Sequence, residues 1–140
     1  MNVVYRKQMS HRKTGKDKLY KSFGYAFEGI INTIIHERNM QIHCCVTLLV
    51  VIFGFLLKIS LAEWMVCLLL FALVLSLELV NTAMEAVVDL ATSERKPLAK
   101  KAKDAAAGAV LVSAIIAAVL GGIIFFPKLG ELFFHLLHSK

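Results

Sequence analysis

Three long apolar stretches divide this chain, and polar residues separate them. Residues 40–58, 63–90 and 98–126 are each long enough to cross a hydrocarbon core of roughly 30 Å as helices. Residues 18–36 differ, because their apolar positions recur at intervals of three and four with polar residues between them. That pattern predicts an amphipathic helix in the membrane interface. We therefore expect an all-α membrane protein with one surface helix and three transmembrane helices.

The composition excludes an ordinary soluble domain. Apolar residues make up 58% of the 140 residues, and the mean hydropathy is +0.69. The net charge of +6 does not indicate a nucleic-acid partner, because the basic residues flank apolar spans and line no aromatic-studded groove. They gather before the first span and between the second and third. By the positive-inside rule, the N-terminus lies in the cytoplasm and the C-terminus outside.

Both ends of the chain are expected to lie outside the membrane domain, which covers residues 18–126. Residues 1–17 are predicted to form a basic cytoplasmic tail that contacts anionic lipid headgroups. Pro127 is expected to end the third span, which leaves residues 127–140 as an external appendage. His135 and His138 have helical spacing there, but without further donors they favour a polar face over a zinc site.

The sequence lacks the common nucleotide-binding loops and hydrolase motifs. Neither GxxxxGK[ST] nor GxGxxG occurs, so neither loop holds a bound nucleotide, and GxSxG is absent as well. Cys44, Cys45 and Cys67 lie in apolar helix without CxxC spacing, and we interpret them as packing residues.

An acidic stripe at the end of the second span is the strongest chemical signal. A helix turns about 100° per residue, which brings Glu78, Glu85 and Asp89 within roughly 40° of one another, with Asn81 about 60° to one side. Glu37 precedes the first span at a similar membrane level. Each carboxylate at such depth costs roughly 2.5–3.5 kcal/mol on insertion scales. These acids are therefore expected to face protein, water or a cation.

These residue types suit phosphoryl transfer. Carboxylates from different helices suit Mg²⁺, and another in a partly dry setting can act as a general base toward an alcohol. Lys18, Lys96 and Lys103 are candidates for holding phosphate oxygens. The residues alone leave open two other uses, namely pairing with bases of neighbouring subunits and lining the path of a small transporter or channel. A transporter or channel predicts acids distributed through the depth of the membrane, whereas these acids lie at one end of the span.

Two separated motifs, ELVNTAMEAVVDL and AKDAAAGAVL, resemble the signature of the bacterial diacylglycerol kinase and undecaprenol kinase family of small membrane lipid kinases. KSFGYAFEGI and HERNMQIH extend the resemblance, which runs from about Lys18 to Phe126 and favours the Gram-positive undecaprenol kinase branch. It implies a homotrimeric helical bundle in the bacterial cytoplasmic membrane, with active sites shared between subunits. It also implies Mg²⁺-dependent phosphorylation of a lipid alcohol by ATP, with undecaprenol as the expected acceptor and diacylglycerol as the alternative.

The resemblance further implies roles for individual residues. Glu78 matches the family's proposed proton acceptor, while Glu37 and Glu85 match its metal ligands. Asn81 and Asp89 belong to the core signature. The candidate nucleotide-binding residues are Lys18, Tyr25, Glu37, Glu85, Glu94, Arg95, Lys96, Lys103 and Asp104. The chain departs from the family pattern at Lys18, where Arg is common, and at Lys96, which replaces a usual His.

Overall fold

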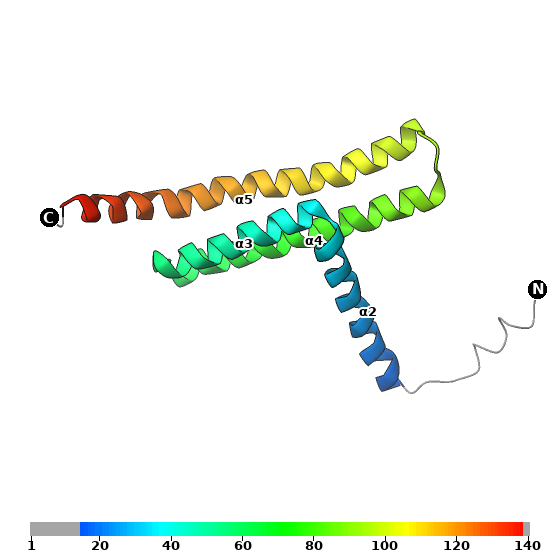
Figure 1. The fold of residues 1–140 in the computed structure, drawn as a ribbon, viewed down its shortest axis with the longest axis horizontal. Helices are drawn as coiled ribbons and strands as arrows, with labels where there is room; N and C mark the ends of the chain where they lie inside the picture. The colour runs from blue at the N-terminus through cyan, green and yellow to red at the C-terminus, as the bar shows by residue number, and fades with distance from the viewer. Residues whose placement is uncertain (1–14, 139–140) are drawn as a thin grey trace, which may run out of the picture. The chain divides into compact units, whose positions relative to one another are not determined.

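The described part of the chain folds into four helices joined by short connections (Figure 1). The structure is a computed structural model that describes residues 15–138, apart from the side chains of residues 15–18 and 135. The helices are α2 (Gly15–His36), α3 (Arg38–Leu56), α4 (Leu61–Ala91) and α5 (Pro97–His138). Helices α3, α4 and α5 are long and apolar enough to cross a membrane. The all-α membrane architecture expected from the sequence is confirmed.

Helix α2 is amphipathic, as its sequence pattern predicts. As far as Asn32 it belongs to a compact unit of its own, and a second unit starts at Thr33. Leu19, Phe23 and Phe27 follow one another at intervals of four residues, and each is 60–63% exposed. An apolar stripe left open in this way suits a helix that lies in the membrane interface.

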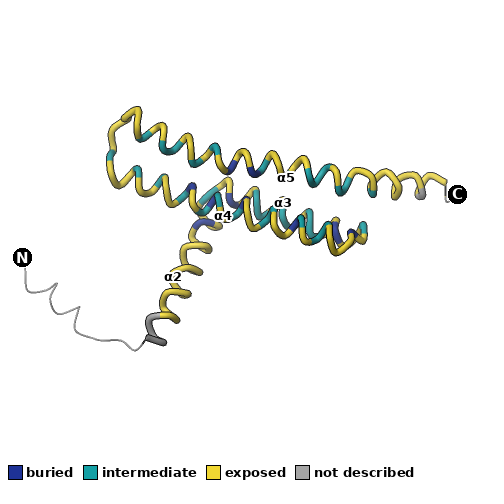
Figure 2. Tube along the Cα trace, turned by 180° about the vertical axis from the view of Figure 1, so that it is seen from behind, coloured by how far each residue is buried: buried dark blue, intermediate teal, exposed yellow. Residues whose placement is uncertain are grey.

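Helices α3, α4 and α5 run in alternating directions, and α4 packs against both neighbours (Figures 1 and 2). Only residues 57–60 connect α3 to α4, and Lys58 adopts a positive φ of 51° in this tight turn. Ser60 and Glu63 then start α4 with a capping box. Glu63 Oε2 accepts a hydrogen bond from Ser60 N at 2.6 Å, and Ser60 Oγ accepts one from Glu63 N at 3.3 Å. A connection this short makes α3 and α4 antiparallel neighbours.

The end of α3 approaches α4 so closely that position 54 requires glycine. A Cβ atom on Gly54 would lie 2.7 Å from Trp64 Cη2. The Trp64 ring also packs on Phe55, with 5.0 Å between ring centroids and a tilt of 50°. This contact fixes the spacing of the two helices beside their turn.

Helix α5 continues through Pro127 to His138, so the prediction that Pro127 ends the third helix is wrong. Proline removes a backbone N–H and clashes with the preceding turn, and for that reason it normally ends or kinks a helix. Here Lys128 follows directly, and its Nζ lies 3.3 Å from Glu63 Oε1 at the start of α4. The ion pair holds α5 against α4 beyond the proline, and helices in membranes tolerate proline comparatively well.

The last turns of α5 carry His138, which stacks on Phe134 with 4.0 Å between ring centroids. His138 Nδ1 also lies 3.0 Å from the Phe134 carbonyl oxygen. Both contacts join residues one turn apart on the same helix. The side chain of His135 lies outside the described part of the chain, so the expectation for this pair of histidines remains a prediction.

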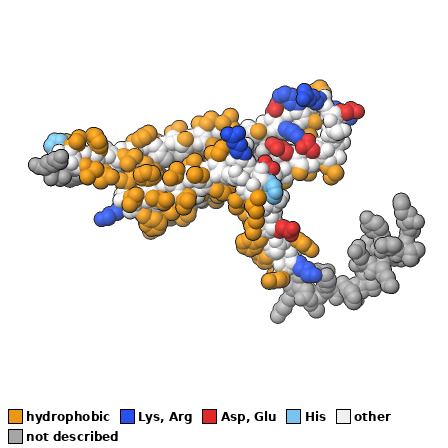
Figure 3. All heavy atoms as spheres, in the orientation of Figure 1, with side chains coloured by type: hydrophobic (Ala, Val, Ile, Leu, Met, Phe, Trp, Pro, Cys, Tyr) orange, Lys and Arg blue, Asp and Glu red, His pale blue; other side chains and the backbone are white. Residues whose placement is uncertain are grey.

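Most large apolar side chains of α3–α5 are exposed (Figure 3), and few residues of these helices are buried (Figure 2). An outer surface of this kind suits contact with lipid. Cys67 is buried, as expected of a packing residue, whereas Cys44 is half-buried and Cys45 lies on the outer surface of α3. Figure 3 also shows acidic and basic side chains gathered over the connection between α4 and α5. The polar chemistry therefore concentrates at that end of the unit.

Candidate active site

Glu78 is the most deeply buried charged side chain among the described residues, with 2% of its surface exposed. The first turn of α3 lies beside it, where the Asn39 side chain interacts with the Glu78 carboxyl. His43, Glu85 and Glu37 act on the same carboxyl electrostatically. Glu78 Oε2 nevertheless has no hydrogen-bond partner within residues 19–138. The structure thus brings the predicted proton acceptor and both predicted metal ligands into one electrostatic neighbourhood.

Asn81 lies between Glu78 and Glu85 on α4 and is only 5% exposed. Its Nδ2 donates a hydrogen bond to Glu85 Oε1 at 3.1 Å. Residues four apart on a helix share a face, so this contact follows from the sequence spacing. The amide therefore fixes the orientation of the Glu85 carboxylate.

Glu37 occupies the break between α2 and α3, where its extended backbone (φ −95°, ψ 114°) makes it the N-cap of α3. Its side chain makes no capping hydrogen bond to α3, and it is half-buried. Gln41 Nε2 donates to the Ile35 carbonyl oxygen at 2.8 Å, which spans the break and satisfies one carbonyl at the end of α2. The break between α2 and α3 therefore presents a carboxylate that does not cap α3.

A cavity of about 880 Å³ lies at the connection between α4 and α5. The connection is held by Thr92 Oγ1, which accepts from Glu94 N at 3.2 Å, and by Pro97, which starts α5. The cavity lining includes five of the nine predicted nucleotide-binding residues, namely Glu94, Arg95, Lys96, Lys103 and Asp104. It also includes Asp89 of the core signature and three polar residues that were not predicted, Thr92, Ser93 and Lys100.

The lysines of this cavity already face carboxylates. Lys103 Nζ lies 2.6 Å from Asp89 Oδ1, and Lys96 Nζ lies 3.5 Å from Glu94 Oε2. Lys100 pairs with Asp104 one turn further along α5. Such a basic, partly neutralised cavity suits a polyphosphate, whose oxygens can compete for the lysines. Lys100 was not predicted as a site residue, because a Lys–Asp pair four residues apart is typical of a solvated helix face.

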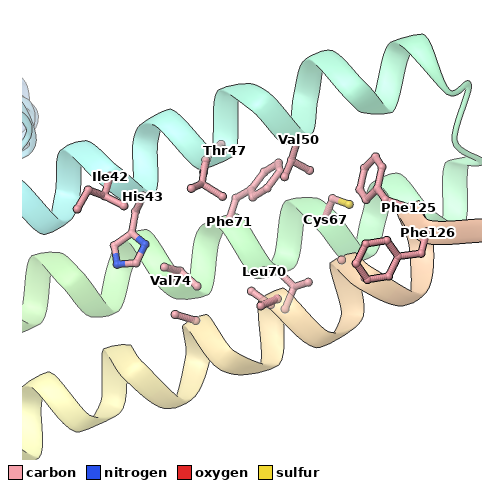
Figure 4. A pocket seen from close by; sticks show the side chains of 16 residues that line it. Ile42, His43, Thr47, Val50, Cys67, Leu70, Phe71, Val74, Phe125 and Phe126 are labelled. Carbon is pink, nitrogen blue, oxygen red and sulfur yellow. The ribbon is translucent and has the colours of Figure 1, made fainter. Parts of the chain in front are cut away.

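A second cavity, of about 550 Å³, is an apolar groove between α3, α4 and α5 (Figure 4). Its walls are mostly aliphatic and aromatic, and the imidazole of His43 lies at one end of it. Val74 also lines the groove, and it lies one helical turn before Glu78 on α4. The groove therefore ends beside the buried carboxylate, and its composition suits an apolar chain. The sequence prediction missed His43, whose only signal was a polar position at the start of an apolar span.

Two predicted nucleotide contacts lie on α2. Tyr25 is 70% exposed there, and Lys18 has no described side chain. Because α2 up to Asn32 belongs to the other unit, the contacts predicted for both residues remain predictions.

The carboxylates near Glu78 suit a hard cation that is bound by the protein and by a phosphate group together. Among the described residues, no group of three or more His, Cys, Asp or Glu side chains is placed to hold a metal by itself. Glu37 and Glu85 supply carboxylate oxygens near Glu78, which are the ligands that Mg²⁺ prefers. Mg²⁺ is commonly bound through one or two carboxylates, with water and substrate phosphates completing its shell. The two acids and a bound triphosphate therefore match its requirements.

Known proteins resemble the chain over most of its length. A family model described as prokaryotic diacylglycerol kinase matches residues 24–125. The Bacillus subtilis protein named undecaprenol kinase is 50% identical over 113 residues, which are 81% of this chain and 92% of that protein. The Synechocystis protein named diacylglycerol kinase is 42% identical over 112 residues, or 79% of this chain and 64% of its own length. The Escherichia coli diacylglycerol kinase is 30% identical over 122 residues, or 87% of this chain and 100% of its own length.

Proposed function

This chain belongs to the prokaryotic diacylglycerol kinase family and is a lipid kinase, and we propose that it transfers the γ-phosphoryl group of ATP to undecaprenol. The acceptor is inferred from the 50% identity to a protein named undecaprenol kinase. Diacylglycerol is the alternative acceptor, because relatives with 42% and 30% identity are named diacylglycerol kinases. The observation that carries the mechanism is the burial of Glu78 at the end of the apolar groove, near the carboxylates of Glu37 and Glu85.

Glu78 accepts the proton of the lipid alcohol. Its Oε2 is buried without a protein donor in the described part of the chain, so it is available to an incoming hydroxyl. The alcohol O–H bond breaks and the proton moves to Glu78 as the alcohol oxygen forms its bond to the γ-phosphorus. The bond from that phosphorus to the bridging oxygen of ADP breaks, and ADP keeps the electron pair.

The cavity between α4 and α5 binds the polyphosphate of ATP. Lys96, Lys100 and Lys103 line it, and each already faces a carboxylate that a phosphate oxygen can replace. Phosphoryl transfer depends mainly on positioning and on stabilising the charge of the transferred group. These lysines supply the positioning and the positive charge, although the sequence has no GxxxxGK[ST] loop.

Glu37 and Glu85 would hold Mg²⁺ against the nucleotide. When bound, the cation neutralises phosphate charge and favours departure of ADP. Asn81 orients the Glu85 carboxylate through its hydrogen bond at 3.1 Å. Glu37 contributes from the start of α3, where no capping bond occupies its side chain.

The lipid reaches Glu78 from within the membrane. The apolar chain of the lipid fits the groove of about 550 Å³. At the end of the groove where His43 lies, the lipid hydroxyl group meets Glu78. The basic residues around the first span and the α4–α5 connection support a cytoplasmic N-terminus in the bacterial cytoplasmic membrane, with the C-terminus outside. The homotrimer implied by the family resemblance remains part of this proposal.

Activity of the purified full chain with each acceptor tests the proposal. The protein, in lipid-containing micelles with labelled ATP and Mg²⁺, is given undecaprenol or diacylglycerol separately. We expect labelled undecaprenyl phosphate to form at least about tenfold faster than labelled phosphatidic acid, a difference of about 1.4 kcal/mol in transition-state binding. Faster labelling of diacylglycerol would establish the alternative acceptor. Labelling of neither lipid would overturn the function.

A further inference from the structure

Asn81 lies between Glu78 and Glu85 on α4, and its two amide atoms have different surroundings. Nδ2 donates to Glu85 Oε1 at 3.1 Å, whereas Oδ1 is buried and has no hydrogen-bond partner in the described residues. An ionised carboxylate accepts hydrogen bonds and cannot donate them, so the amide nitrogen must be the atom that faces Glu85. The amide orientation is therefore fixed, and its oxygen is directed elsewhere.

The unpaired oxygen of Asn81 has a counterpart on Glu78. Glu78 Oε2 is also buried without a partner among residues 19–138. The two residues are three positions apart on one helix, so their side chains are neighbours on the same face. Two buried acceptors with no donor between them are unfavourable unless a bound group supplies a hydrogen. The pair is therefore suited to receive an O–H group.

We propose that Asn81 is a positioning residue that couples the metal ligand Glu85 to the general base Glu78, an assignment that rests on the proposed lipid kinase function. Its Nδ2 holds one oxygen of Glu85 and leaves the other for the cation. Its Oδ1 shares with Glu78 Oε2 the hydrogen of the lipid hydroxyl, in a three-centred hydrogen bond. The alcohol is thus aligned before its proton passes to Glu78.

Replacement of Asn81 by leucine separates this role from a structural one. Leucine has the same branched arrangement of side-chain heavy atoms and removes the donor and the unpaired acceptor together, which leaves folding nearly unchanged when the amide serves only as packing. A positioning role predicts a folded protein with a damaged site instead. Asn81→Gln, which keeps the amide on a longer side chain, tests for partial rescue. Ser113→Ala is the matched control, because Ser113 is 3% exposed and its hydroxyl donates to Val110 O of its own helix at 2.7 Å.

Binding of Mn²⁺ with ATP, followed by electron paramagnetic resonance, gives a readout that does not depend on turnover. We expect Asn81→Leu to weaken Mn²⁺ binding about tenfold or more, as is typical when the partner of a metal ligand is lost. We also expect kcat to fall about a hundredfold, with helicity and thermal unfolding close to those of the unchanged protein. Asn81→Gln should recover part of the Mn²⁺ affinity, and Ser113→Ala should change neither quantity.

Three results would overturn the assignment. The first is Asn81→Leu with Mn²⁺ affinity and kcat both within about threefold of the unchanged protein. The second is that the Asn81→Leu variant and the Asn81→Gln variant both fail to fold, which would make Asn81 a determinant of folding. The third is loss of kcat with unchanged Mn²⁺ affinity, which would break the link to Glu85. Failure of the unchanged protein to phosphorylate either lipid would instead count against the proposed function.

Discussion

Lys103 on α5 and Asp89 on α4 form an ion pair with 2.6 Å between Nζ and Oδ1, and this pair joins two walls of the α4–α5 cavity. The Lys103 side chain is 35% exposed and that of Asp89 is 67% exposed. Exposed pairs contribute only about 0–1 kcal/mol to stability. The pair therefore matters less for folding than for where it holds the Lys103 ammonium group, which faces the space assigned to the polyphosphate.

Substitution of Lys103 should damage nucleotide binding and leave the fold nearly unchanged. Lys103→Met keeps the length of the side chain and removes its charge. We expect the KM for ATP to rise about tenfold or more and kcat to fall as well, because the cation contacts phosphate oxygens in the ground state and the transition state. Steady-state kinetics over ATP concentration measures both. Lys101→Met, at an exposed neighbouring position, is the control. Equal kinetics for the two variants would remove Lys103 from the site.

Glu78→Gln should abolish turnover in a folded protein. The amide is isosteric with the carboxylate, so the buried position stays filled, but it cannot accept the alcohol proton. Loss of a general base typically costs about 10²–10⁴ in rate. The measurement is kcat with saturating ATP and lipid, together with thermal unfolding in micelles. Glu131→Gln, on the exposed last part of α5, should keep full activity. Near-native turnover of Glu78→Gln would contradict the assigned role.

The helices and the acidic stripe were predictable from local periodicity, whereas the burial that distinguishes the acids was not. Helical spacing alone places Glu78, Glu85 and Asp89 on one side of α4, and it also permits the contact between Asn81 and Glu85. It cannot reveal that Glu78 is 2% exposed while the Asp89 side chain is 67% exposed. That difference depends on where α3 and α5 pack along α4, which is set by contacts between distant parts of the chain.

The end of the third helix shows the same limit of local rules. Pro127 predicts a helix end from its own chemistry, and α5 nevertheless continues. The stabilising contact comes from Glu63, 65 positions away in the sequence, which binds Lys128 at 3.3 Å. Similarly, His43 looked like an isolated polar position in a span, and only the packing of α3 on α4 brings it beside Glu78.

Removal of either carboxylate assigned to Mg²⁺ should change the metal dependence before it changes the fold. Glu37→Gln and Glu85→Gln each keep side-chain volume and lose one anionic ligand. We expect the Mg²⁺ concentration for half-maximal activity to rise about tenfold or more, and maximal activity to fall. A titration of Mg²⁺ at fixed ATP measures this shift. Glu28→Gln, on the exposed surface of α2, is the control. An unchanged Mg²⁺ titration for both site variants would exclude them as ligands.

Gly54→Ala should destabilise the α3–α4 hairpin through a clash between two helices. The new methyl group would lie 2.7 Å from Trp64 Cη2 and 3.2 Å from Ile59 Cδ1, so the indole ring has to move. Overpacking of this kind costs about 1–3 kcal/mol, which outweighs the gain of up to about 1 kcal/mol from replacing glycine in a helix. Gly130→Ala is the control, because nothing lies within 4 Å of its added Cβ atom. Thermal unfolding in micelles should therefore shift downward for Gly54→Ala and stay level or rise for Gly130→Ala. If Trp64→Phe, which shortens the ring, restored no stability to Gly54→Ala, the clash with Trp64 would not be the cause of the loss.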